Sequence, residues 1–351
     1  MMKPLGRPES PFTTRPESTY KSGKVIQTNG ATSDRQPASG NAAMVSGNVR
    51  GRWGGWVWAA PATLVLVLLG LVVAWHGGGI AGTARWPEQQ TAFLALNAVF
   101  GKVPAPLWSA VTLLGDASVL MLLLALFLLG RPQVFVAVLA SVPAGALFSV
   151  LLKHWADVPR PAAVLDHASF HLIGPALHHN SFPSGHTVSA FAAAAAVLAT
   201  LAPSPRCGRE WVLLVAGLMV AVAVALSRVA VGAHWPLDLV AGASGGWLAG
   251  LSGAALARHA GWWQWLFFGA GRRVASVGLI VWGLLVWFRP HDTLTGAAVL
   301  GLAGLCGIAA GLGLLLTGRS VSALPVPLAT RSSAPDASVD ETVDQVALSD
   351  R

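Results

Sequence analysis

Three short groups of polar residues interrupt a largely apolar chain, and their side chains are of the types that bind phosphate and transfer a phosphoryl group. The groups are Lys153 with Arg160-Pro161, Pro183-Ser184-Gly185-His186, and Ser227-Arg228 with His234 and Asp238. Only 11% of the 351 residues are charged. Because polar groups close to a bilayer are costly and are usually functional, these three groups mark the candidate site.

A phosphate ester requires positive charge and N–H donors around its oxygens. Lys153, Arg160 and Arg228 supply the charge, and arginine pairs with two phosphate oxygens at once. Ser184 and Gly185 directly precede an apolar run, so the N–H groups of a helix N-terminus should point at the anion. Gly185 lets the backbone approach closely, and the Ser184 hydroxyl can add a donor. These five residues are the predicted phosphate-binding set.

The two histidines of these groups have different neighbours. His234 precedes Asp238 by four residues, so one helical turn brings the carboxylate to the imidazole. This contact fixes the tautomer and leaves the other ring nitrogen free to attack phosphorus. His186 has no adjacent carboxylate, and a bound phosphate would keep it protonated as a general acid.

The composition is that of an integral membrane protein. Hydrophobic residues make up 54% of the chain, and the mean hydropathy is +0.60. These values are typical of membrane proteins. The net charge of +8 comes from scattered basic residues without an aromatic-interleaved stripe, which argues against nucleic-acid binding. Cys207 and Cys306 have neither a disulfide framework nor zinc-ligand spacing.

Hydropathy predicts an all-α, polytopic transmembrane helix bundle. The expected spans are about 56–75, 117–130, 133–152, 184–202, 211–226, 236–257, 275–288 and 294–316. An interfacial helix is expected at 91–103, within a mixed segment. Asp116 fits the N-cap of the second span, with a supporting role in the active site as the alternative. Pro236 fits the first turn of the sixth span.

The chain divides into four parts by composition. Residues 1–54 and 318–351 are polar and are expected to be disordered tails, because such segments cannot bury enough apolar surface to order themselves. Residues 55–257 form a predicted six-helix core, and residues 258–317 add about two helices.

The distribution of basic residues predicts the orientation. Alternating spans place both termini on one side, which carries ten arginines near the spans: Arg35, Arg50, Arg52, Arg131, Arg206, Arg209, Arg258, Arg272, Arg273 and Arg319. The other side has three cations, or six with those of the polar groups. The positive-inside rule therefore favours cytoplasmic termini and a site on the outer face. The high Ala and Gly content favours a bacterial cytoplasmic (inner) membrane.

Together the three groups resemble the motifs of the type 2 phosphatidic acid phosphatase (PAP2) superfamily. The pattern is Lys153-x6-Arg160-Pro161, then Pro183-Ser184-Gly185-His186, then Ser227-Arg228-x5-His234-x3-Asp238, and the resemblance covers about 56–257. It implies a lipid phosphatase that needs no metal or other cofactor. In that family the residue matching His234 forms a phosphohistidine, the one matching His186 protonates the leaving group, and the one matching Asp238 orients the nucleophile. The resemblance says nothing about the last two helices.

The expected substrate is a phosphomonoester or pyrophosphate of a membrane lipid, such as phosphatidic acid, phosphatidylglycerol phosphate or a polyprenyl pyrophosphate (undecaprenyl pyrophosphate among them). Lipid and bilayer are the expected partners, and no protein partner is indicated. A lipid phosphotransferase using the same site remains an alternative, as does a non-catalytic lipid transporter or scaffold. The membrane spans argue against a soluble vanadate-dependent haloperoxidase.

Five further histidines lie between Lys153 and Pro183: His154, His167, His171, His178 and His179. Their spacing matches no standard set of metal ligands. We expect these side chains to contact solvent or a lipid headgroup.

Overall fold

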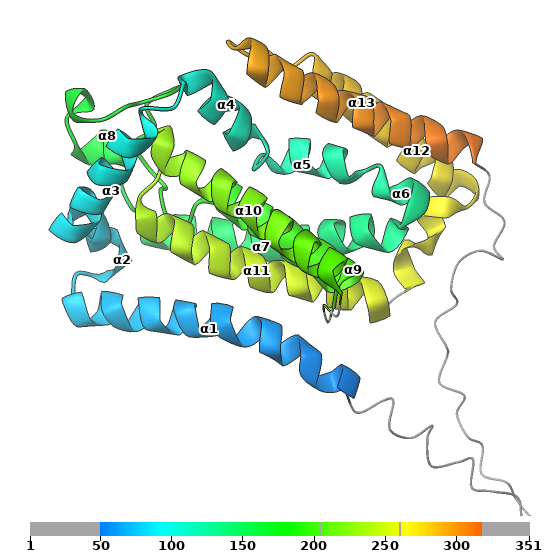
Figure 1. Cartoon of the computed structure of the whole chain (residues 1–351), viewed down its shortest axis with the longest axis horizontal. Coiled ribbons are helices and arrows are strands. Elements are labelled where there is room, and N and C mark those ends of the chain that lie inside the picture. Colours follow the sequence, from blue (N-terminus) through cyan, green and yellow to red (C-terminus); the bar gives the residue numbers. More distant parts are fainter. Residues whose placement is uncertain (1–49, 204, 206, 260, 318–351) are drawn as a thin grey trace, which may run out of the picture. The chain divides into compact units, whose positions relative to one another are not determined.

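The computed structural model describes residues 50–203, 205, 207–259 and 261–317, with 50–56 as helical backbone. Every regular element in these residues is helical (Figure 1), which confirms the predicted fold class. The α-helices are α1 (Arg50–His76), α2 (Gly79–Gly82), α3 (Pro87–Phe100), α4 (Ala105–Leu113), α5 (Ala117–Leu124), α6 (Phe127–Gly130), α7 (Pro132–Ala156), α8 (Pro161–Val164), α9 (Gly185–Leu201), α10 (Gly208–Ala230), α11 (Pro236–His259), α12 (Gly269–Trp287) and α13 (Leu294–Leu316). Short 3-10 turns are η1 (Thr83–Arg85), η2 (His167–Ser169) and η3 (Gly261–Phe267).

The described residues contain six helices that are long and apolar enough to cross a membrane. They correspond to α1, α7, α10, α11, α12 and α13, and each overlaps a predicted span. The fourth predicted span corresponds to α9, an apolar helix of 17 residues that falls just short of that length. The chain is therefore a multi-pass membrane protein.

The second predicted span, 117–130, is formed by α5 and α6 in succession, and α4 precedes this segment at a bend of 68°. The bend has a local cause. Asp116 has an extended backbone, and its carboxylate accepts hydrogen bonds from Ser118 N and Val119 N, so it caps a new helix instead of continuing the previous one. The predicted N-cap role of Asp116 is confirmed. We call residues 112–116 the elbow.

Several helices extend beyond the predicted limits. Helix α1 begins at Arg50, so residues 50–54 are helical rather than part of a disordered tail. Helix α12 begins at Gly269, six residues before the predicted span. A hydropathy window follows apolar composition, whereas backbone hydrogen bonding continues through polar residues at a helix end. The rest of the predicted tails, 1–49 and 318–351, lies outside the described residues.

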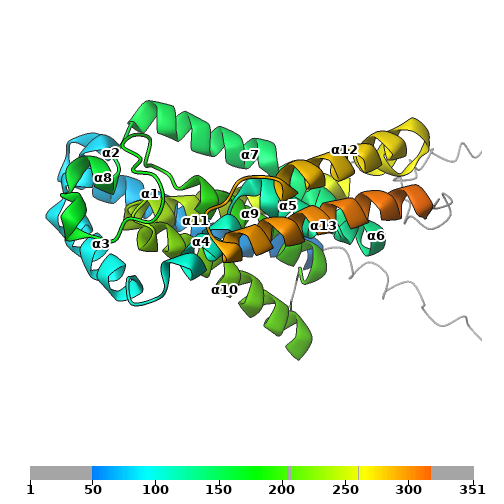
Figure 2. The same cartoon turned by 90° about the horizontal axis from the view of Figure 1, so that it is seen from above.

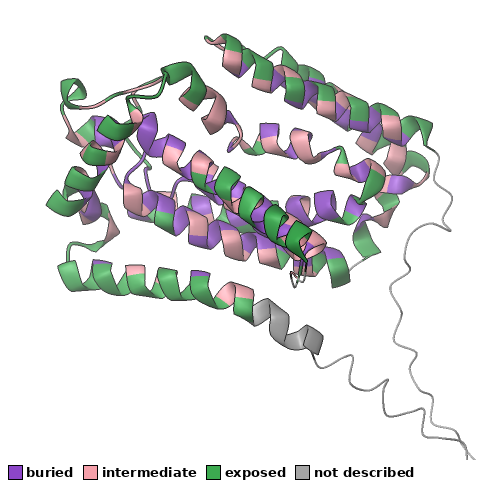
Figure 3. Cartoon of the chain, viewed as in Figure 1, coloured by how far each residue is buried: buried purple, intermediate pink, exposed green. Residues whose placement is uncertain are grey.

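Helices α7, α9 and α11 pack closely, and their packing sets the site. A Cβ atom built on Gly246 of α11 would lie 2.4 Å from the carbonyl oxygen of Val188 in α9, so only glycine permits this approach. The close packing brings the N-termini of the two helices together, where Ser184 N donates to Asp238 O at 3.1 Å. Helix α1 contacts mainly α11, and its residues 57–76 are mostly exposed (Figure 3).

The last two helices, α12 and α13, lie side by side, and α13 packs against α4 and α5 (Figure 2). Two polar contacts connect Trp282 of α12 and Arg289, two residues beyond the end of that helix, to the start of α5. Trp282 Nε1 donates to Ser118 Oγ at 2.8 Å, and Arg289 Nη2 lies 3.0 Å from Asp116 Oδ2. These helices thus belong to the same contact unit as the predicted core.

Candidate active site

Hydrogen bonds connect the three polar groups at neighbouring helix ends. Lys153 lies in the last turn of α7, and its Nζ donates to Asn180 O at 2.8 Å, just before the second group. Arg160 Nη1 lies 3.3 Å from His234 Nε2, which connects the first group to the third. The Ser184–Asp238 backbone contact connects the second to the third. The structure thus assembles the groups that the sequence analysis selected.

Arg160 is fixed by backbone carbonyls on both sides of the site. Its Nε donates to His179 O at 2.8 Å, its Nη1 to Ala233 O at 3.0 Å, and its Nη2 to Asn180 O at 3.4 Å. The residue as a whole is largely buried, with 9% of its surface exposed. The position of the guanidinium is therefore set before any ligand binds, with Nη1 directed at His234 Nε2.

The tautomer of His234 follows from its neighbours. Its Nδ1 lies 3.2 Å from Asp238 Oδ2 and 3.4 Å from Ser181 Oγ, while Ser181 Oγ donates to the same carboxylate oxygen at 2.5 Å. Both neighbours of Nδ1 are thus available as acceptors, so Nδ1 carries the proton. Nε2 faces the N–H donors of Arg160, so it is unprotonated.

Burial lowers the pKa of His234 well below its ordinary value of 6.5, and the positive charges of Arg160 and Arg228 lower it further. His234 and Asp238 are both almost completely buried. The imidazole is therefore neutral at physiological pH, with a lone pair on Nε2. This is the protonation state that a nucleophile requires.

Arg228 lies in the last turn of α10, and the elbow holds it. Its Nη1 donates to Thr112 Oγ1. Its Nε is buried and has no hydrogen-bond partner among the described residues. An unpaired buried N–H on a charged group is costly, and an anion would satisfy it.

The start of α9 also offers unpaired donors. Ser184 is the N-cap, but its side chain makes no capping hydrogen bond. Its hydroxyl is fully buried and accepts a hydrogen bond from Thr187 Oγ1 at 3.0 Å. A Cβ built on Gly185 would have only Ser149 Oγ nearby, at 3.8 Å, so protein packing does not require glycine there. The first-turn N–H groups of α9 are left for a ligand.

His186 is the second residue of α9 and is partly exposed. Its ring makes no hydrogen bond to any described residue. Arg228, Asp116, Arg160 and Lys153 all act on it electrostatically. The elbow touches it directly, since a Cβ built on Gly115 would lie 2.9 Å from His186 Cβ. The charges of Arg228, Arg160 and Lys153 disfavour protonation of this imidazole while the site is empty. A bound phosphate would offset these charges and favour the protonated form, which can donate to the leaving group.

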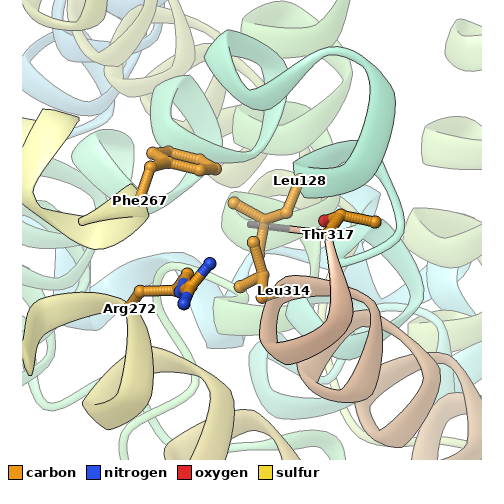
Figure 4. A pocket seen from close by; sticks show the side chains of 5 residues that line it. All are labelled: Leu128, Phe267, Arg272, Leu314 and Thr317. Carbon is orange, nitrogen blue, oxygen red and sulfur yellow. The ribbon is translucent and has the colours of Figure 1, made fainter. Parts of the chain in front are cut away.

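No three or more described His, Cys, Asp or Glu side chains are placed to hold a metal ion. The five further histidines noted in the sequence, His154 of α7 included, thus form no such group. A small pocket lies between α6, η3, α12 and α13, lined by Leu128, Phe267, Arg272, Leu314 and Thr317 (Figure 4). None of the predicted site residues lines it.

Sequence reasoning missed three side chains that form hydrogen bonds with predicted site residues: Ser181, Thr112 and Thr187. Ser181 lies two residues before Pro183, so its nearness to the second polar group was a signal in the sequence that could have identified it. Thr112 lies 116 residues from Arg228 and belongs to no motif. Only the fold brings it to the guanidinium.

Residues 134–264 match the family model described as the PAP2 superfamily. This segment contains every predicted site residue. A curated relative, the undecaprenyl-diphosphatase of Sulfolobus acidocaldarius, is 41% identical over 83 residues. That alignment covers 23% of this chain and 36% of the relative, so the match spans about a third of the relative's length.

Two solved structures are similar in part. The crystal structure of Aquifex aeolicus LpxE is 25% identical, covers 46% of this chain and 94% of its own, and has a TM-score of 0.38. A transmembrane PAP2-type phosphatidylglycerolphosphate phosphatase from Bacillus subtilis is 20% identical, covers 55% and 94%, and has a TM-score of 0.42. Both TM-scores lie below 0.5, and neither superposition assigns a residue of the site.

Proposed function

We propose that the chain, whose residues 134–264 match the PAP2 superfamily model, is a member of that superfamily and hydrolyses a phosphomonoester or diphosphate of a membrane lipid through a phosphohistidine on His234. The observation that carries the proposal is the state of His234. Its Nδ1–H is held by Asp238, while its unprotonated Nε2 faces Arg160 at 3.3 Å.

In the first step, a non-bridging oxygen of the substrate replaces His234 Nε2 as the acceptor of the hydrogen bond from Arg160 Nη1. Another non-bridging oxygen accepts a hydrogen bond from the unpaired Nε–H of Arg228. The first-turn N–H groups of α9 and the ammonium of Lys153 complete the binding of the anion. His234 Nε2 then attacks phosphorus, and the bond to the leaving oxygen breaks. That oxygen takes its proton from His186.

In the second step, water attacks the phosphohistidine. His186, now neutral, takes the proton from that water, as microscopic reversibility requires. The P–N bond breaks and releases inorganic phosphate, and the lone pair returns to Nε2. Asp238 stabilises the positive charge that the imidazole carries while it is phosphorylated. Each group ends the cycle in its starting protonation state.

The test is phosphate release by the purified, detergent-solubilised chain from a panel of lipid phosphates and diphosphates. We expect release from at least one of them. The panel should include a polyprenyl diphosphate, because the Sulfolobus acidocaldarius relative is an undecaprenyl-diphosphatase. A chain that cleaves its substrate without releasing free phosphate would be a phosphotransferase, and a chain inert on the whole panel would refute the proposal.

Asp238→Asn should lower kcat on the order of 10- to 100-fold with little change in KM. An asparagine oxygen can still accept from His234 Nδ1 and Trp235 N, which both contact Asp238 Oδ2. The negative charge that stabilises the phosphorylated imidazole is lost. Steady-state kinetics measure the effect. The control is Asp166→Asn, because Asp166 is an exposed cap residue away from the site and asparagine caps equally well. Equal kcat values for the two variants would contradict the role of Asp238.

Activity should survive EDTA and be inhibited by vanadate. The proposed chemistry uses protein cations and N–H donors, and vanadate mimics pentacoordinate phosphorus. Phosphate release with EDTA, with added Mg²⁺, and with orthovanadate checks both expectations. A strict requirement for a metal ion would contradict the mechanism.

The orientation and domain limits are part of the same proposal. The ten-to-three distribution of basic residues supports cytoplasmic termini and a site at the outer face of a bacterial-type inner membrane. Residues 55–257 form the catalytic core, and 258–317 add α12 and α13, which pack against α4 and α5.

A further inference from the structure

Helix α3 carries a buried face that mixes amide and aromatic side chains. Gln89, Phe93 and Asn97 follow one another at intervals of four residues and therefore lie on one side of the helix. Their exposed fractions are 4%, 0% and 1%. Polar side chains this deeply buried require partners, and both amides find theirs in the segments that carry the catalytic groups.

Asn97 holds the end of α10. Its Nδ2 donates to Val229 O at 2.9 Å and Ala230 O at 3.3 Å, directly after Arg228. The same amide group donates to His171 O at 3.0 Å and accepts from His171 N at 2.7 Å. The last carbonyls of a helix have no partner within it. Asn97 thus satisfies the C-terminus of α10 from another helix and ties the 165–182 loop to it.

Gln89 holds the start of α11. Its Oε1 accepts from Leu237 N at 3.1 Å, and its Nε2 donates to Thr83 O at 2.8 Å. Leu237 lies in the first turn of α11, where N–H groups have no partner within the helix, and the next residue is Asp238. Gln89 therefore satisfies the N-terminus of the helix that carries the orienting carboxylate.

Phe93 fills the space between these two amides. Its ring packs edge-on against Trp235, with ring centroids 5.3 Å apart, and against Phe170 at 5.4 Å. Trp235 is fully buried and follows His234 directly. One face of α3 thus contacts residues that precede His234 (Val229 and Ala230) and residues that follow it (Trp235 and Leu237).

We propose that α3 is a positioning element for the reaction, acting through Asn97 at the end of α10 and through Gln89 at the start of α11. The two amides fix both ends of the 229–237 connection, and so they set the direction of His234 Nε2 relative to Arg228 and Asp238. The inference rests on the proposed function. It adds a segment that precedes the family match, which begins at residue 134.

Gln90 provides a matched control on the same helix. Its Nε2 donates to Ala84 O at 3.0 Å, as Gln89 Nε2 donates to Thr83 O, but its side chain makes no hydrogen bond to a catalytic segment among the described residues. Gln89→Met and Gln90→Met therefore each remove one hydrogen bond to η1, and only the first removes the contact with Leu237. Gln89→Glu keeps an oxygen facing Leu237 N, and because burial favours the neutral acid, its hydroxyl can still donate to Thr83 O; it serves as the conservative variant.

We expect Gln89→Met to lower kcat about 10- to 100-fold, because a small displacement of a nucleophile has effects of this size. KM should change little, since the cations that bind phosphate stay in place. Gln90→Met should match the wild type, and Gln89→Glu should recover most of the lost kcat. Asn97→Asp, which turns an acceptor toward Val229 O and Ala230 O, should show the same loss of kcat at nearly constant KM.

A second measurement does not depend on turnover. Calorimetry should show that Gln89→Met weakens the binding of vanadate, which bonds to a correctly aligned nucleophile, while the binding of inorganic phosphate is unchanged. Equal behaviour of Gln89→Met and Gln90→Met would overturn the inference, and so would a Gln89→Glu variant as slow as Gln89→Met. A wild type inert on every lipid phosphate would refute the proposed function, and the vanadate comparison would still decide the role of α3.

Discussion

Replacing His234 by alanine should abolish phosphate release, with a loss of about 10⁴-fold or more in kcat. The reason is that Nε2 of this ring provides the only proposed bond to phosphorus, and neither Arg160 nor Asp238 can replace it. Binding of inorganic phosphate should persist, because its ligands are on other residues. Rates of release and phosphate affinity, measured on the same purified preparation, separate these two expectations.

His154→Ala is the control for that experiment. His154 is an exposed histidine next to Lys153 in the last turn of α7. Its replacement should leave turnover close to that of the wild type. If His234→Ala kept appreciable turnover, the phosphoryl group would not pass through this residue, and a non-catalytic or differently catalysed function would have to replace the account.

Replacing His186 by alanine should separate substrates by their leaving groups. Loss of a general acid costs about 10²- to 10⁴-fold when the leaving oxygen must be protonated. An alkyl phosphate such as a phosphatidic acid needs that proton, whereas an aryl phosphate such as a nitrophenyl ester leaves as a stable anion. The alkyl substrate should therefore lose most of its rate and the aryl substrate much less.

The two substrates should be compared as kcat/KM in the wild type, in His186→Ala and in His154→Ala. A ratio of alkyl to aryl activity that falls only in His186→Ala assigns the acid to this residue. Equal losses on both substrates would instead indicate that His186 binds the phosphate or supports α9.

The parts of the site that the sequence predicts are those encoded within a few residues. The four-residue spacing of His234 and Asp238 becomes a hydrogen bond across the first turn of α11. Asp116 caps α5 as its residue type predicts, and Pro236 begins α11. Each of these results depends on local backbone geometry, which neighbouring residues determine.

The parts that the sequence does not predict come from contacts across long separations. Gln89 meets Leu237 across 148 residues, and Thr112 meets Arg228 across 116. No periodicity or motif marks such pairs, because the packing of several helices creates them. The bend before α5 was missed for a related reason. Hydropathy measures apolar content, and this content stays high on both sides of the bend. A hydropathy profile therefore does not show where the chain changes direction.

The most direct test of the account is the location of the phosphoryl group during turnover. The enzyme should be quenched in alkali, where a phosphohistidine survives, within the first turnovers on a radiolabelled phosphate ester, and the modified residue should then be mapped by mass spectrometry. His186→Ala with an aryl phosphate should accumulate the intermediate, because hydrolysis then lacks its base. The account predicts acid-labile phosphate on Nε2 of His234, and none in His234→Ala. Phosphate on Nδ1, on another residue, or on no residue while phosphate release proceeds would contradict it.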